Sequence, residues 1–201
     1  MNEEHHDGED FVAAERAHRL AKLGELRQRG IDPYPVKYER DTTPGEIRER
    51  FEHLEPGEET DTTVRVAGRV MLIRRHGALI FADLHDQTGT LQLLASRDDL
   101  GEQGEHDLAE LDRGDWVGVE GQVIRSRKGE LSIRVRSFAL LAKALRALPD
   151  KHRGLIDVDT RLRQRYLDLI VNPETRRTFD VRTRAIEAVR RVLNERGFTE
   201  V

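Results

Sequence analysis

The residues of this chain best suited to chemistry surround one short apolar stretch, Ala78 to Leu84. Alternation along a strand places Phe81 on the face opposite the aliphatic residues of that stretch. Arg74 and Arg75 precede it by one turn. An aromatic ring beside guanidinium groups on an exposed sheet is a platform on which nucleobases stack. Packing under a loop or helix is the competing explanation for an isolated Phe, so the rest of the chain has to decide between the two.

Other kinds of site find little support in the sequence. Asp157 and Asp159 alternate in a connector and are better explained as helix-start or solvated groups than as a catalytic pair. His5 and His6 lie in an acidic tail, where solvation explains them better than metal binding. The chain has no Cys, which excludes disulfides and thiolate metal sites and suits a cytoplasmic protein. No apolar run is long enough for a membrane span, and the acidic N-terminus does not resemble a signal peptide.

The distribution of charge indicates a polarised domain. The net charge of −4 argues against indiscriminate nucleic-acid binding, which needs a broadly basic surface. However, residues 122–146 carry seven Lys and Arg against one acid, whereas residues 97–121 carry nine acids against two Arg. Such a domain fits a partner that is recognised locally. Within the basic part, Arg125, Arg127 and Lys128 could contact phosphates, although a solvated hairpin tip explains them equally well.

Composition and periodicity divide the chain into five parts. These are a disordered tail over 1–10, helices and a linker over 11–62, a strand-rich region over 63–146, an interdomain segment over 147–172 and a helix from 173 towards 201. In the second part we expect a helix from about residue 9 to 29 and a short helix over Pro44–Phe51 with Thr43 as N-cap. In the last part we expect Asn172 as N-cap and a Schellman-like stop at Gly197.

The strand-rich region contains five predicted strands, with a short helix near residues 107–111 between the third and the fourth. Gly68 in the first strand suggests a bulge or a sharp bend, and alternation places Leu72 on the same face as Val70. Three strands, a helical insert and a closing hairpin, with a bent first strand, is the order of an OB-fold. An SH3-like barrel or a Greek-key sandwich is compatible with the pattern, but we favour a mainly β fold with α elements, built on a five-stranded OB-fold barrel.

The expected OB-fold gives the exposed Phe a context. The ligand face of this fold is formed largely by the second and third strands, where Phe81 and Gln92 point outward together. In the fifth strand, alternation places Glu130 and Ser132 outward. It places Leu131, Ile133 and Val135 inward. This agreement favours a ligand-binding role for Phe81 over a purely structural one.

Several long stretches, in the right order, resemble the N-terminal part of a class II lysyl-tRNA synthetase. They are RAHRLAKLGELRQRGIDPYP, GRVMLIRRHGALIFADLHDQTGTLQLL, KGELSI and ALPDKHRGLIDVDTRLRQRYLDLIVNPETRRTF. The last stretch runs into RTRAIEAVRRVLNERGFTEV, which is similar to the approach to class II motif 1. Aspartyl- and asparaginyl-tRNA synthetases share the OB-fold, and the segment GLIDVDTRLRQRYLDL is what favours lysine.

The resemblance implies that the OB-fold binds a tRNA with a UUU or CUU anticodon. Phe81 matches the family's aromatic that stacks on the central uridine, while Arg74, Gln92 and Glu130 match its polar neighbours, with Arg75 beside them. Gln92 can donate and accept hydrogen bonds, Arg74 only donates and ionised Glu130 only accepts. We therefore expect Phe81 to supply affinity, Arg74 and Gln92 to select uridine, and Glu130 to contact a neighbouring base.

The resemblance also implies a cytoplasmic, homodimeric enzyme that uses ATP and Mg²⁺ in its full-length form. Nothing in the chain matches class II motifs 2 and 3, and Val201 falls where motif 1 would continue. We therefore expect a truncated class II catalytic domain, no cofactor in this chain, no metal site and no ligase activity by itself. The alternative is a free-standing OB-fold nucleic-acid-binding module or a synthetase paralogue. A reading frame that continues past Val201 would identify a full-length ligase.

Overall fold

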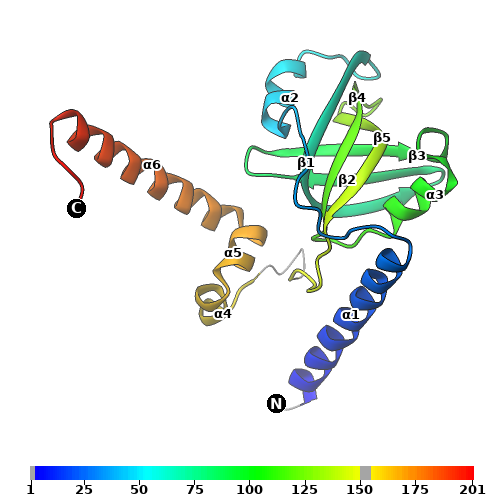
Figure 1. The fold of residues 1–201 in the computed structure, drawn as a ribbon, viewed down its shortest axis with the longest axis horizontal. Coiled ribbons are helices and arrows are strands. Elements are labelled where there is room, and N and C mark those ends of the chain that lie inside the picture. Colours follow the sequence, from blue (N-terminus) through cyan, green and yellow to red (C-terminus); the bar gives the residue numbers. More distant parts are fainter. Residues whose placement is uncertain (1–2, 150–154) are drawn as a thin grey trace. The chain divides into compact units, whose positions relative to one another are not determined.

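The computed structural model describes residues 3–149 and 155–201, and the chain divides into two compact units (Figure 1). The first unit is Met1–Ala147 and the second is Leu148–Val201. Residues 1–2 of the expected tail and residues 150–154 of the expected interdomain segment lie outside the described residues. No described helix is both long enough and apolar enough to cross a membrane.

Five strands of the first unit form a closed barrel in the order β1-β2-β3-β5-β4. Their bounds are β1 Glu59–His76, β2 Leu79–His85, β3 Thr90–Ser96, β4 Trp116–Arg125 and β5 Leu131–Ala142. β3 and β5 run parallel to each other, and the other neighbouring strands are antiparallel. This arrangement confirms the predicted OB-fold.

Alternation along the strands builds the core of the barrel. Ile80, Ala82 and Leu84 of β2 are almost completely buried, and every second residue of β3 and β4 follows the same rule. In β2 and β3 the residues between them are half-buried or exposed, whereas in β4 Gly118 and Ile124 are buried as well. The barrel therefore has an apolar interior, and β2 and β3 have a largely accessible outer face. The sequence pattern predicted this alternation correctly for β2 and β3.

The first strand departs from simple alternation. The pairing of β1 with β2 shifts register between Val70 and Leu72, which marks a β-bulge. The bulge lies a few residues beyond Gly68, the residue that suggested it. The bulge moves Leu72 away from the face of Val70 and lets Ile73 pack against the core, so the predicted position of Leu72 was wrong. Position 68 is a glycine for a different reason, because a Cβ there would lie 2.8 Å from the Leu84 Cγ.

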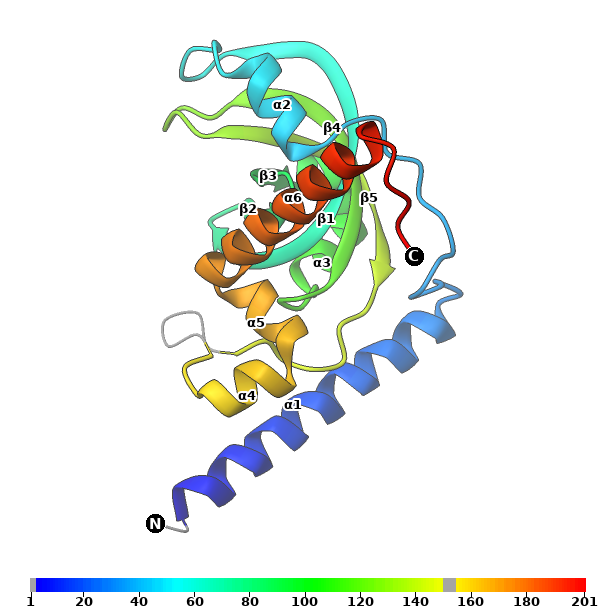
Figure 2. The same cartoon turned by 90° about the vertical axis from the view of Figure 1, so that its left-hand side faces the viewer.

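Three helices accompany the barrel: α1 Glu3–Gln28, α2 Pro44–Phe51 and α3 Arg97–Ala109. In both views the C-terminal end of α1 lies close to the barrel, while its N-terminal turns project away (Figures 1 and 2). α1 begins at Glu3, inside the stretch predicted to be disordered, because no proline interrupts the helix there. α3 is longer than the predicted helix because Ser96 caps it early, its hydroxyl accepting a hydrogen bond from the Asp99 backbone N–H.

The short helix α2 matches its prediction. The Thr43 hydroxyl accepts a hydrogen bond from the Glu46 backbone N–H, and the Glu46 carboxylate accepts one from the Thr43 backbone N–H at 2.8 Å. This reciprocal capping box fixes the start of the helix. Ile47 and Phe51 then bury one face of α2 in the barrel core. α2 is thereby held on the barrel.

The second unit consists of three helices, α4 Val158–Arg163, α5 Arg165–Val171 and α6 Pro173–Glu195. Asp157 caps α4 by accepting a hydrogen bond from the Thr160 backbone N–H at 2.7 Å, as expected of a helix-start acid. Asn172 occupies the N-cap position of α6, but its side chain makes no capping bond and donates to the Asp168 carboxylate instead. At the far end, hydrogen bonds from the backbone N–H groups of Gly197 and Phe198 close the predicted Schellman-like stop.

Candidate nucleic-acid interface

Strand register gathers the predicted site residues on one outer face of the barrel. Arg74 lies opposite Phe81 in the pairing of β1 with β2, Asp83 lies opposite Gln92 in that of β2 with β3, and Gln92 lies beside Ser132 in that of β3 with β5. Residues paired in this way share a face of the sheet. We call this set the outer strip; its members are Arg74, Phe81, Asp83, Gln92, Leu94, Glu130, Ser132 and Arg134.

Phe81 lies in the middle of the outer strip. Its ring is half-buried, between the fully buried Ile80 and Ala82 along β2. Leu94 is its cross-strand neighbour on β3 and supplies an aliphatic surface on one side. Arg74 is its neighbour on β1, at the base of the exposed hairpin tip. The ring is therefore supported from below and flanked by an apolar and a cationic side chain, which suits a stacking platform.

Each polar neighbour of Phe81 that the sequence singled out has a partner of its own. The Arg74 guanidinium approaches the Asp83 carboxylate at 3.5 Å, and both groups remain accessible to solvent. The Gln92 side-chain oxygen accepts a hydrogen bond from the Ser132 hydroxyl at 3.1 Å. Ser132 itself is fully buried, which differs from the exposed position that alternation predicted, because Gln92 and the hairpin backbone cover it.

Glu130 is held by a residue that the sequence did not single out. The Arg48 guanidinium of α2 donates to the Glu130 carboxylate at 3.2 Å and to the Thr90 carbonyl at 2.7 Å. Arg48 thus connects α2 to the ends of β3 and β5 beside the outer strip. No local pattern could have revealed this contact, because Arg48 and Glu130 are 82 positions apart in the chain.

The remaining basic residues of the prediction differ in where they lie and in how exposed they are. Arg75 lies opposite Ile80 in the strand register and therefore faces the other side of the hairpin from Arg74. Arg127 and Lys128 are exposed at the tip of the β4–β5 hairpin, where a phosphate could reach them. For the half-buried Arg125 the phosphate contact stays a prediction. Its guanidinium donates to the carbonyls of Glu52 and Gly129 and holds the hairpin to the linker before β1.

A buried ionic cluster lies in the same unit and anchors α1. The Lys143 ammonium, at 2% exposure, contacts the carboxylates of Asp112 and Asp115, and Lys22 of α1 reaches Asp112 at 3.1 Å. Arg19 of α1 adds hydrogen bonds to two backbone carbonyls of the same loops. We call Lys22, Asp112, Asp115 and Lys143 the anchor cluster. The sequence analysis did not find it, because its members come from three distant segments.

The anchor cluster shifts the pKa of two of its groups. Burial acts to raise the pKa of Asp112, but hydrogen bonds and charge attraction from Lys143 and Lys22 outweigh it and leave the pKa below its ordinary value of 3.8. Burial likewise acts to lower the pKa of Lys22, while Asp112 and Glu110 outweigh it and leave the pKa above 10.5. Both groups are therefore charged throughout the neutral pH range.

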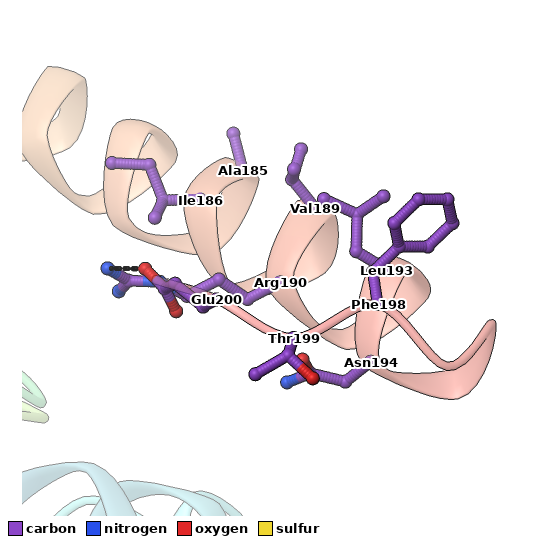
Figure 3. Close-up of a pocket in the computed structure, with 9 residues that line it drawn as sticks. All are labelled: Ala185, Ile186, Val189, Arg190, Leu193, Asn194, Phe198, Thr199 and Glu200. Carbon is purple, nitrogen blue, oxygen red and sulfur yellow. Dashed lines mark hydrogen bonds and ion pairs between the residues drawn. The ribbon is translucent and has the colours of Figure 1, made fainter.

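The second unit offers a groove of different chemistry. A cavity of about 510 Å³ lies between α6 and the extended segment after it (Figure 3). Its walls are mainly aliphatic, and the Arg190 guanidinium closes one side by pairing with Glu200 at 2.9 Å. Ile186, Val189 and Leu193 line it from the helix, with Phe198 beyond the turn. The polar residues of its lining are Arg190, Asn194, Thr199 and Glu200.

Two protein families match the chain. Residues 64–141 match the OB-fold nucleic acid binding domain, the tRNA anticodon family, and residues 157–201 match the class II tRNA synthetases for D, K and N. The first match covers the barrel from β1 to β5, and the second covers the three helices of the second unit. The sequence prediction of an OB-fold followed by the start of a class II domain agrees with both matches.

Individual relatives agree with the families. Lysine–tRNA ligase of Carboxydothermus hydrogenoformans is 47% identical over 91% of this chain and 36% of its own length. That of Moorella thermoacetica is 50% identical over 91% of this chain and 36% of its own length. That of Clostridium perfringens is 42% identical over 98% of this chain and 38% of its own length.

The chain thus spans little more than a third of the length of the relatives it matches. The similarity runs through both units, so a free-standing OB-fold module is not favoured. The fold, both family matches and the identity of 42–50% to lysine–tRNA ligases together show that the chain belongs to the class II lysyl-tRNA synthetase family.

Proposed function

We propose that the barrel binds the anticodon of a lysine tRNA, with UUU or CUU as its sequence, through the outer strip. The observation that carries this proposal is the position of Phe81, half-buried between a cationic and an aliphatic neighbour on the OB-fold's ligand face. Every member of the strip except Glu130 belongs to a barrel strand, so the platform is part of a rigid barrel. A base stacked on Phe81 would have its edge within reach of the polar side chains around it.

The polar members of the outer strip have different roles in base recognition. Stacking tolerates any base, so the choice of base depends on hydrogen bonds to its edge. Arg74 lies opposite Phe81 on β1, and Gln92 lies diagonally from Phe81 on β3, opposite Asp83. Both can supply donors to the carbonyl oxygens of a uracil. Glu130 lies further along the strip and supplies an acceptor for a neighbouring base. Arg127 and Lys128 extend the basic surface towards the RNA backbone.

The direct experiment measures binding of this chain to two short RNA hairpins. One carries the loop sequence UUU, and the other is identical except that the middle U is replaced by C. The proposal expects tighter binding of the UUU hairpin, at a stated salt concentration because phosphate contacts are salt-dependent. Equal affinity for the two hairpins would contradict anticodon reading by the outer strip. A scrambled hairpin of the same length serves as the control for binding that depends on charge alone.

For the longer protein we propose the activity that the names of the relatives state, the ligation of lysine to tRNA, in a cytoplasmic homodimer. In such a reaction ATP, together with Mg²⁺, would activate the lysine. Within residues 155–201 the structure describes three helices, α4 to α6, and no strand. The apolar groove along α6 supports an interface in the second unit, which sedimentation of the full-length protein and of a Leu193→Asp variant would test.

A further inference from the structure

A buried hydroxyl contacts two of the three polar residues to which base recognition is assigned, Gln92 and Glu130. Ser132 is fully buried, and its position beside Gln92 places it on the inner edge of the outer strip. Its Oγ lies 3.1 Å from the Gln92 side-chain oxygen and 3.0 Å from the Glu130 backbone carbonyl oxygen. Ser132 cannot touch an RNA base itself, since Gln92 and the strand backbone lie between it and the surface.

The hydrogen atoms around Ser132 decide what Gln92 shows to the outside. A side-chain amide has one accepting end and one donating end, and only one of them can face inward. Here the oxygen of Gln92 faces the Ser132 hydroxyl, so the NH₂ group faces outward. No other hydrogen bond to the Gln92 amide is made within residues 3–149 and 155–201, so nothing else in that part of the chain fixes its orientation.

The outward end of the amide distinguishes the two pyrimidines. Uracil presents a carbonyl oxygen at its fourth ring position, which accepts a hydrogen bond from NH₂, whereas cytosine presents an amino group there. An outward NH₂ therefore pairs with uracil and meets a second donor in cytosine. An outward oxygen would accept from the cytosine amino group and would favour the wrong base.

We propose that Ser132 is a positioning residue, which holds the Gln92 amide with its donor outward and so sets the preference for uracil over cytosine. The inference rests on the proposed anticodon function and adds a specificity-determining residue to it. The single hydroxyl hydrogen has two acceptors within reach, Gln92 and the Glu130 carbonyl. When it points to Gln92, the amide reads uracil; when it points only to Glu130, the oxygen of Ser132 attracts the amide donor and the preference is lost.

The test compares Ser132→Ala with Ser137→Ala in this chain, using the hairpins with UUU and UCU loops. Ser137 is an exposed residue of the same strand with no described hydrogen bond to the strip, so it is a matched control. We expect Ser132→Ala to reduce the ratio of the two affinities by roughly fivefold or more, because one oriented hydrogen bond is lost. Ser137→Ala should leave that ratio as it is. A Ser132→Ala variant with the full preference for UUU would overturn the proposal.

Three further variants separate the possible outcomes. Ser132→Thr retains the hydroxyl and should retain the preference for UUU over UCU. A folded Thr variant that has lost this preference would count against a role of the hydroxyl. Gln92→Glu replaces the outward donor by an acceptor and should shift the preference towards UCU; an unchanged preference would show that Gln92 does not read this base. Phe81→Ala separates the two proposals, because it should weaken both hairpins equally. If it weakened neither, the anticodon function itself would fail.

Discussion

Two sets of ionic groups in the barrel unit, those of the outer strip and those of the anchor cluster, are built in opposite ways. In the outer strip, Arg74 meets Asp83 at 3.5 Å and Arg48 meets Glu130 at 3.2 Å, with all four side chains partly or largely exposed. In the anchor cluster, Lys143 is 2% exposed, and its partner Asp115 is completely buried.

The difference shows what each set of charges is for. Exposed pairs contribute little to the free energy of unfolding because water competes for both partners. The same exposure lets such a pair exchange its protein partner for an RNA group at small cost. A buried pair cannot make that exchange, and removing one partner leaves an uncompensated charge in the interior. The charges of the anchor cluster that hold α1 are therefore buried, and the charges proposed to meet a ligand are not.

The largest effect is expected for Lys143→Met. This change leaves Asp115 buried without its cation, and breaking a buried ion pair in this way typically costs about 3–5 kcal/mol. We expect a loss of that size in the free energy of unfolding, measured by urea denaturation of this chain. RNA affinity measured on folded protein should change little, because none of the anchor residues belongs to the outer strip.

The matched control for Lys143→Met is Lys37→Met. Lys37 pairs with Glu39 at 2.6 Å, closely resembling a buried pair in geometry, but both side chains are largely exposed. Its replacement should change the free energy of unfolding by about 0–1 kcal/mol. Similar losses in the two variants would show that burial does not distinguish these sites and would remove the basis of the comparison.

The next largest effect is expected for Phe81→Ala, on binding rather than on folding. Loss of one base stack should weaken the UUU hairpin by about 1–3 kcal/mol, as measured by a fluorescence titration. Phe198→Ala removes an exposed ring from the second unit and should leave RNA affinity unchanged. An equal loss in both variants would indicate nonspecific contact with RNA, not stacking in the outer strip.

A smaller effect is expected from pH on the anchor cluster. The pKa of Asp112 lies below 3.8 in the folded chain, so its contribution to stability is present above that pH and is lost as the pH falls through the folded pKa. The pKa of Lys22 lies above 10.5, so its contribution is present below that pH and is lost as the pH rises through the folded pKa.

Asp112→Asn tests the acid side of this dependence. The variant should be less stable than the wild type at pH 7. The difference should begin to shrink below about pH 4, where the Asp112 carboxylate of the unfolded chain binds a proton, and should be lost as the pH falls through the lower pKa of the folded chain. Urea denaturation at a series of pH values measures the difference directly. A difference that stays constant down to the lowest pH would mean that the charge of Asp112 contributes nothing.

Local chemistry explains which features the sequence could predict. The Thr43 cap, the stop at Gly197 and the strand alternation around Phe81 depend on neighbours within a few residues, and the structure has all three. The β1 bulge was misplaced because Gly68 had a second reason to be glycine, the close approach of Leu84, that a strand pattern does not reveal.

The missed contacts share a different cause. Ser132 meets Gln92 only because β5 runs parallel to β3, and the anchor cluster forms only when α1, the loop before β4 and the end of β5 come together. Single polar residues at such positions carry no periodic signal. In the candidate site, the sequence therefore predicted which groups face outward and missed the contacts that Ser132 and Arg48 make with two of them, Gln92 and Glu130.

The smallest effect is expected for Arg48→Ala, which releases Glu130 on the side of α2. The pair is exposed, so the free energy of unfolding should fall by only about 0.2–1 kcal/mol. Binding should show the change differently from Ser132→Ala, because Glu130 is assigned to a base next to the central one. Titration with hairpins altered at each loop position should therefore show weaker discrimination beside the middle base and an unchanged preference at the middle base.

Arg50→Ala provides the control on the same helix. Arg50 lies over the Phe51 ring at 5.0 Å and makes no described contact with the outer strip. Its loss should leave discrimination at every loop position as it is. If Arg48→Ala instead reduced discrimination at the middle base, the strip would act as one coupled network. Exposed charges would then be as constrained as buried ones, contrary to the contrast between the strip and the anchor cluster.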